Sequence, residues 1–221
     1  MNNEFLKRIL SSLVLIPVAF FFIIKGSYFF DFFILICFLI SSYEWHIMSK
    51  NKKYYLLGFI FIIFSFYAVY YLRNEMAGDY VYFIMIVMIC IFTDIGGYIF
   101  GKIFKGPKLT KISPNKTYSG VIGGYFFSII FMSFYFSYSD FIYKFINLNI
   151  TEAELELHQF VFVIVISTIS QLGDITISYF KRLSKIKNTG KIIPGHGGLL
   201  DRIDGMIFAF PTTYLIFKIF Y

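Results

Sequence analysis

The residues best suited to chemistry are concentrated in one stretch near the end of the chain, Ser178–Asp204. Lysines and arginines flank a glycine-rich sequence, Pro194–Gly198, and two aspartates close the stretch in Asp201-Arg202-Ile203-Asp204. Glycines let backbone N–H groups come close to an anion, and such groups bind phosphate. His196, inside the glycine-rich sequence, is a candidate for proton transfer or for contact with a phosphate, and a structural role is equally open. The stretch therefore predicts a site for a phosphate-bearing substrate.

Three aspartates form a predicted metal site. Asp201 and Asp204 are three residues apart and share a face if a helix begins there. Asp174 lies upstream in an apolar segment, where a carboxylate is costly and normally faces a polar cavity with a cationic partner. Mg²⁺ is commonly held by a few carboxylates together with substrate phosphates, and can clamp phosphates during transfer. The structural alternatives are an ion pair between Asp174 and Lys181 near the interface, and acidic capping of a helix start by Asp201 and Asp204.

The segment after Asp174 has helical spacing. Ser178 and Lys181 follow it at four and seven residues, which places the three side chains on one helical face. We therefore expect these residues to face the same polar environment.

A second polar region lies between residues 93 and 120. Asp94 is near the end of one apolar segment, and the next segment opens after Ser113, Lys116 and Thr117. Hydroxyl groups, a lysine and free amides at a helix N-terminus can cradle a phosphate or a nucleotide. The alternative is an ordinary proline-initiated helix start with a lysine on the cytoplasmic side.

The elements that position these residues are membrane helices. The 221 residues are 58% hydrophobic and 23% aromatic, which is more apolar surface than a soluble domain of this size could bury. We expect an all-α, polytopic integral membrane protein that forms a single domain over residues 1–221. Seven apolar runs are each long enough to cross a bilayer: Ile9–Ile24, Tyr28–Tyr43, Tyr54–Leu72, Tyr80–Phe100, Gly120–Tyr138, Gln159–Phe180 and Ile203–Phe220.

Charge predicts the orientation of these helices. With the N-terminus inside, most of the 20 lysines and arginines lie on the cytoplasmic side. This agrees with the rule that cytoplasmic loops of membrane proteins carry an excess of Lys and Arg. The loops 101–118 and 181–202 then face the cytoplasm together, and the acidic loop Asp140–Leu157 faces outward. The net charge of +7 favours anionic partners such as lipid head groups or a phosphate-bearing substrate. It does not favour nucleic acid, because the charge sits in short loops. Trp45 and His46 are interpreted as interfacial residues at the end of the second helix.

The stretch Ser178–Asp204 resembles the signature of the phosphatidate cytidylyltransferase (CDP-diacylglycerol synthase) family. The matching residues are Ser178, Lys181, Arg182, Lys187, Asn188, Gly190, Pro194, His196, Gly197, Gly198, Asp201, Arg202 and Asp204. The pair Gly173-Asp174, the pair Thr93-Asp94 and the segment Ser113–Gly120 match further family motifs. The resemblance is strong over residues 90–210, whereas the first three helices match only in character. Asn188 stands where the family usually has Asp, Asn115 where it has Lys or Arg, and Ser119 where it has Glu.

The resemblance implies the reaction CTP + phosphatidate → CDP-diacylglycerol + pyrophosphate in a bacterial-type inner membrane. It divides the chain into N-terminal helices, residues 1–90, and a catalytic region, residues 91–210. It implies catalytic roles for Asp174, Lys181, Arg182, His196, Asp201, Arg202 and Asp204. It implies substrate contacts by Asp94, Ser113, Lys116, Thr117, Ser178, Lys187, Asn188, Gly197 and Gly198. The implied cofactor is Mg²⁺ on Asp174, Asp201 and Asp204, and the resemblance leaves room for a second, monovalent cation and for a homodimer.

Two other classes of function stay open on the sequence, a related CTP-dependent enzyme and a transporter. A related CTP-dependent enzyme would act on another lipid phosphate, and a CTP-dependent kinase would release CDP rather than pyrophosphate. An ion-coupled transporter would use Asp31, Asp94 and Asp174 as carriers, but it does not explain the glycine- and lysine-rich loop.

Overall fold

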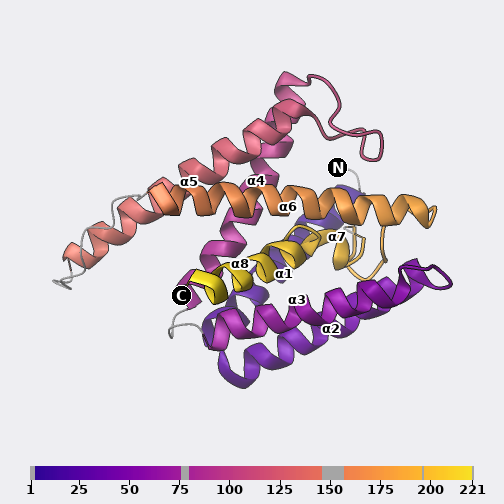
Figure 1. Cartoon of the computed structure of the whole chain (residues 1–221), viewed down its shortest axis with the longest axis horizontal. Helices are drawn as coiled ribbons and strands as arrows, with labels where there is room; N and C mark the ends of the chain where they lie inside the picture. The colour runs from indigo at the N-terminus through magenta and orange to yellow at the C-terminus, as the bar shows by residue number, and fades with distance from the viewer. Residues whose placement is uncertain (1–2, 76–79, 146–156, 196, 221) are drawn as a thin grey trace. The chain divides into compact units, whose positions relative to one another are not determined.

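The computed structural model describes residues 3–75, 80–145, 157–195 and 197–220. Apart from two isolated β-bridges, the regular structure in these ranges is helical, which confirms the all-α prediction (Figure 1). The helices are α1 (Asn3–Lys25), α2 (Ser27–Ser49), α3 (Tyr55–Asn74), α4 (Tyr80–Phe104), α5 (Tyr118–Phe145), α6 (Leu157–Leu183), α7 (Leu200–Ile203) and α8 (Met206–Phe220).

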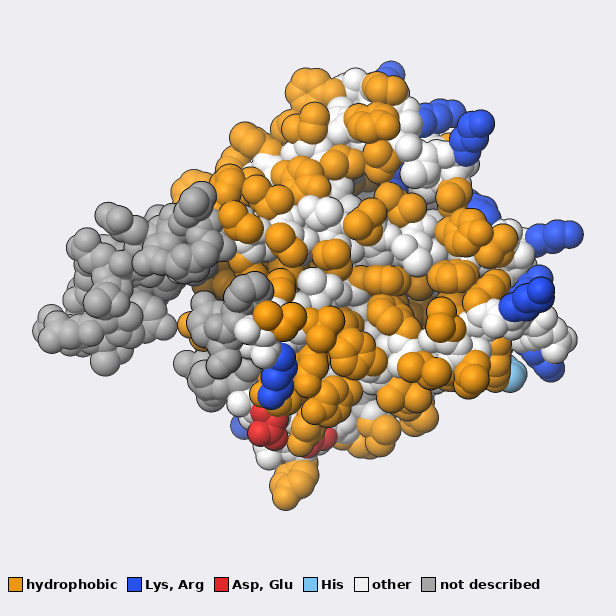
Figure 2. Space-filling view, viewed as in Figure 1, with side chains coloured by type: hydrophobic (Ala, Val, Ile, Leu, Met, Phe, Trp, Pro, Cys, Tyr) orange, Lys and Arg blue, Asp and Glu red, His pale blue; other side chains and the backbone are white. Residues whose placement is uncertain are grey.

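Each of the first six predicted apolar runs coincides with one helix, and most of the seventh forms α8. Within the described residues, α2, α3, α4, α5 and α6 are long and apolar enough to cross a membrane, and α1 and α8 contain shorter apolar helices. Figure 2 shows apolar side chains over most of the visible face, as expected of a surface in contact with lipid. The chain is a multi-pass membrane protein, while the number of crossings stays a prediction.

Several boundaries differ from those predicted, since α2 continues to Ser49 and α4 to Phe104. The last run does not form one helix from Ile203, because the chain makes the short helix α7 and then restarts as α8 at Met206. Helix α5 continues to Phe145, so Asp140 is helical rather than in a loop. The glutamates of the predicted outer loop, Glu152, Glu154 and Glu156, lie outside the described residues.

The chain forms two compact units, Met1–Met85 with Gly173–Tyr221, and Ile86–Leu172. The units alternate along the chain rather than dividing it at one point. The prediction of a single domain, with a division near residue 90, stays a prediction.

The core of the first unit is built on the hairpin of α2 and α3, with α8 beside α3 (Figure 1). The ring of Trp45 lies against α3 at Gly58, where any side chain would overlap it. Small residues of this kind let membrane helices approach closely. Trp45 is only 3% exposed and donates from Nε1 to the Tyr55 carbonyl at 3.0 Å, so it belongs to the core as well as to the end of the helix. The Ser65 hydroxyl ties α3 to α8 through the Ile207 carbonyl at 2.8 Å.

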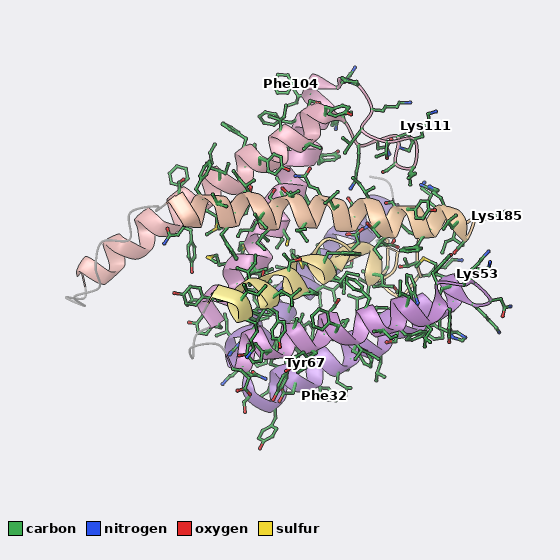
Figure 3. The ribbon with its side chains drawn as sticks, viewed as in Figure 1. Phe32, Lys53, Tyr67, Phe104, Lys111 and Lys185 are labelled. Carbon is green, nitrogen blue, oxygen red and sulfur yellow. The ribbon has the colours of Figure 1, made fainter. Side chains whose placement is uncertain are left out.

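One end of the first unit gathers two of the predicted cytoplasmic segments. Lys53, in the turn between α2 and α3, and Lys185, just after α6, lie at this end in Figure 3. Ser184 connects them, since its hydroxyl donates to the Met48 carbonyl at 2.6 Å and lies 3.2 Å from the Tyr54 hydroxyl. Which side of a membrane this end faces stays a prediction.

The second unit packs through glycines and hydroxyls. Gly96 and Gly123 face each other between α4 and α5 so closely that a side chain on either would strike the other's backbone. The Thr93 hydroxyl donates to the Ile89 carbonyl at 2.7 Å and lies 2.9 Å from the Ser167 hydroxyl on α6. This packing holds the part of α4 that carries Asp94.

Candidate active site

Helix α6 carries the first group of predicted site residues. The Ser178 hydroxyl donates to Asp174 Oδ1 at 3.4 Å, so the two lie on one helical face as the spacing predicts. The preceding residue, Gly173, has a structural reason to be glycine, because a Cβ there would lie 2.8 Å from the Asp204 carbonyl oxygen. The backbone of Asp204 therefore lies directly against α6, one residue from Asp174.

Asp201 is a carboxylate held by three hydrogen bonds. Its Oδ1 accepts from Lys181 Nζ at 2.8 Å, and its Oδ2 accepts from the backbone N–H groups of Thr189 at 2.9 Å and Gly198 at 3.1 Å. The Lys181 and Asp201 side chains are only 12% and 6% exposed. A buried ion pair is tolerated where further hydrogen bonds satisfy both groups. The structure thus brings together two predicted site residues that are 20 positions apart.

The glycine-rich sequence forms a tight turn. Ile193 and Gly197 exchange two backbone hydrogen bonds, of 2.9 and 3.2 Å, which close the turn around Pro194 and Gly195. Gly195 and Gly197 have φ values of 75° and 96°, a region that favours glycine. The N–H group of Gly197 donates to the Ile193 carbonyl, and that of Gly198 donates to Asp201 Oδ2. A phosphate would therefore have to compete with these acceptors for the two N–H groups. His196 lies outside the described residues.

Glu44 is a buried carboxylate that the sequence analysis did not select. It lies on α2 and is 1% exposed. Its Oε2 accepts from the Thr189 hydroxyl at 2.9 Å and from the Leu200 N–H at 2.8 Å, and its Oε1 accepts from the Leu199 N–H at 2.9 Å. A signal was present in the sequence, because an acidic residue in an apolar helix indicates a functional site.

Two glycines of the loop lie directly against Glu44. A Cβ on Gly190 would lie 2.6 Å from Glu44 Oε1, and a Cβ on Gly198 would lie 2.6 Å from Oε2 and overlap the Thr189 hydroxyl. These glycines therefore admit the carboxylate, a role separate from the phosphate binding expected of glycine-rich sequences.

The remaining predicted residues of the first unit lie on its surface. Arg182, Lys187, Asn188 and Arg202 are exposed. Asn188 lies beside Asp201, because a Cβ on Gly197 would lie 3.4 Å from Asn188 Cγ and 3.0 Å from Asp201 Oδ2. Asn188, which stands where the family usually has Asp, therefore lies next to the buried carboxylate of Asp201.

The second unit carries the other predicted residues. The Thr117 hydroxyl accepts from the Gly120 N–H at 3.1 Å, which caps the start of α5 and supports the structural alternative for this residue. Lys116 Nζ lies 3.5 Å from the Gln171 carbonyl, and the Ser113 N–H donates to the Thr110 hydroxyl at 3.1 Å. Asp94 is exposed on α4. Substrate contact by these residues stays a prediction.

The metal site also stays a prediction. Among the described residues, no group of three or more His, Cys, Asp or Glu side chains is arranged to hold a metal ion. The donor chemistry nevertheless fits Mg²⁺, which takes one or two carboxylates and completes its shell with waters and substrate phosphates. Asp201 accepts three hydrogen bonds, and a carboxylate has about four acceptor positions, so it retains capacity for a cation.

Comparison with known proteins decides the family. Residues 53–220 match the model of the Cytidylyltransferase family. The chain belongs to this family. It is 34% identical over 220 residues to a phosphatidate cytidylyltransferase of Rickettsia felis, covering 95% of this chain and 90% of the relative. It is 34% identical to the enzyme of that name from Rickettsia typhi, with 94% and 89% covered, and 35% identical to that of Staphylococcus aureus strain COL, with 83% and 67% covered.

The similarity to cytidylyltransferases extends further than residues 90–210. An alignment over 95% of the chain includes α2 and α3, which the sequence analysis matched to the family only in character. The family model itself begins at residue 53, after α2.

Proposed function

We propose that this chain is a phosphatidate cytidylyltransferase, which converts CTP and phosphatidate into CDP-diacylglycerol and pyrophosphate. The observation that carries the proposal is the alignment, over nearly the whole chain, with relatives that bear this name. The buried Asp201 within the family signature, which accepts three hydrogen bonds, supports it.

The reaction needs no nucleophile from the protein. An ionised oxygen of phosphatidate forms a bond to the α-phosphorus of CTP, and the bond from that phosphorus to the bridging oxygen of the β-phosphate breaks. The electron pair of this bond leaves with pyrophosphate. The protein contributes by aligning the two substrates and by stabilising the charge that develops on the leaving group.

The cationic side chains of the last turn of α6, of α7 and of the loop between them suit these two tasks. Lys181 is held in one orientation by Asp201. Arg182, Lys187 and Arg202 are exposed and can meet the phosphates of CTP or phosphatidate. A fixed lysine and several accessible cations match a reaction in which both substrates are anions.

Asp174 and Asp201, with Asp204 three residues after Asp201, would hold a divalent cation such as Mg²⁺. When bound, that ion supplies positive charge to the phosphates during transfer. The carboxylates of this chain orient the cation, and Lys181 and the loop amides keep Asp201 in place.

We further propose that the N-terminus and both polar loops face the cytoplasm of a bacterial inner membrane. The distribution of basic residues and the bacterial relatives support this placement. It gives the site access to CTP from water and to phosphatidate from the inner leaflet.

The test uses purified protein in detergent with phosphatidate, Mg²⁺ and CTP labelled at the α- or the γ-phosphate. We expect the α-label in the lipid product and the γ-label in pyrophosphate. A γ-label in the lipid would identify a kinase. Transfer to another lipid phosphate but not to phosphatidate would also contradict the proposal.

A further inference from the structure

We infer that Glu44 is a positioning residue for cytidylyl transfer. It acts by holding residues 189–195 and 197–204, called the signature loop from here on and including α7, so that Asp201 keeps its place. The inference rests on the proposed function. Glu44 lies on α2, before the segment that the family model matches.

The burial of Glu44 requires the loop. The side chain is 1% exposed, and a carboxylate without partners at such a position would be strongly destabilising. Its three donors, Thr189, Leu199 and Leu200, are 145 to 156 positions away in the chain. Since all three belong to the loop, the carboxylate and the loop conformation depend on each other.

The first connection to Asp201 runs through α7. This short helix begins at Leu199 and Leu200 and has no capping side chain of its own. The N–H groups at a helix start have no partner within the helix. The Glu44 carboxylate accepts hydrogen bonds from the N–H groups of Leu199 and Leu200, at 2.9 and 2.8 Å. Asp201 is the next residue, so Glu44 fixes the turn that carries it.

The second connection runs through Thr189. Its hydroxyl donates to Glu44 Oε2 at 2.9 Å, and its backbone N–H donates to Asp201 Oδ2 at 2.9 Å. One residue therefore bridges the two buried carboxylates. Gly190 and Gly198 make the arrangement feasible, because a side chain on either would displace Glu44.

The substitution Glu44→Gln tests this role with little change in shape. The amide retains one acceptor oxygen but presents an NH₂ group to at least one of the three donors. Ser41→Ala is the matched control: Ser41 is one turn earlier on α2, is fully buried, and its hydroxyl has no hydrogen-bond partner among the described residues.

Two readouts distinguish positioning from a purely structural role. The first is kcat and KM for CTP, measured on the monodisperse fraction. The second is hydrogen–deuterium exchange of peptides covering residues 189–204. For Glu44→Gln we expect kcat to fall about 10- to 100-fold with KM within about threefold, and faster exchange in these peptides. Ser41→Ala should match the wild type in both.

Two substitutions of Thr189 provide a second test if the Glu44→Gln variant does not fold. Thr189→Val removes the hydroxyl bond to Glu44 but keeps the backbone bond to Asp201, and Thr189→Ser keeps both. We expect kcat to fall in the valine variant and to remain near the wild-type value in the serine variant.

Unchanged kcat and unchanged exchange in folded Glu44→Gln or Thr189→Val would overturn the inference. So would a loss of folded protein with kcat per folded molecule unchanged. A wild-type protein that does not act on phosphatidate would instead refute the proposed function, and the exchange comparison would still show whether Glu44 holds the loop.

Discussion

At the scale of single residues, Asp201 and Lys181 were both predicted site residues, but the ion pair between them was not predicted. The choice of Asp201 and Lys181 as candidate site residues followed from residue type, spacing and the family resemblance. Thr189 and Glu44 were not chosen, because a contact between residues 145 positions apart leaves no local spacing in the sequence. Thr189 also stands at a position where the family signature sets no residue. Side-chain chemistry is therefore visible in the sequence, whereas the long-range partners that hold it are not.

Gly198→Ala tests the close packing around Asp201. The added methyl group would lie 2.6 Å from Glu44 Oε2 and overlap the Thr189 hydroxyl, so the loop must shift. We expect kcat to fall at least about tenfold. The control is Gly97→Ala, where the nearest atom would lie at an ordinary 3.5 Å. Equal kcat values for the two variants would show that the close packing at Gly198 does not affect turnover.

At the scale of elements, the hairpin of α2 and α3 holds the end of α6. The ring of Trp45 lies edge-on to Phe180, with centroids 5.3 Å apart, and Tyr54 also packs on Phe180 at 4.7 Å. Apolar runs predicted these helices. They did not predict the break between α7 and α8, because Ile203 and Met206 were counted in one apolar run. The turn-forming pair Asp204-Gly205 lies between them, and the Gly205 N–H donates to Asp204 Oδ1 at 3.0 Å.

Trp45→Ala should destabilise the first unit. The substitution leaves a cavity in the core and removes the hydrogen bond to Tyr55, which together cost about 3–5 kcal/mol. We expect a clear decrease in the thermal unfolding temperature in detergent. The control is Tyr43→Ala on the same helix, since Tyr43 is 60% exposed and its removal should change that temperature little. Similar unfolding temperatures for the two variants would argue against Trp45 as a core residue.

At the scale of the whole molecule, the sequence predicts membrane helices and their orientation but not the two compact units. Helices α4 and α6 each contribute to both units, so no change in composition marks the division. Charge bias is spread over short loops and is readable from sequence alone.

Single-cysteine labelling tests the predicted orientation. In a background with Cys37→Ala and Cys90→Ala, the variants are Tyr28→Cys, Lys53→Cys and Lys185→Cys. Intact bacterial cells are treated with a membrane-impermeant maleimide. We expect the cysteine at residue 28 to react in intact cells, and those at residues 53 and 185 to react only after permeabilisation. The reverse labelling pattern would place the segments around residues 53 and 185 outside the cell, away from cytosolic CTP.

The most direct test of the central claim compares the wild type with Asp201→Asn in the cytidylyl-transfer assay, at equal amounts of folded protein. The substitution removes the charge that pairs with Lys181 but keeps the size of the side chain. We expect the wild type to form CDP-diacylglycerol and pyrophosphate in equal amounts, and the variant to be slower by at least about a hundredfold. Wild-type turnover in the variant would contradict the claim that this loop, organised around Asp201, carries the reaction.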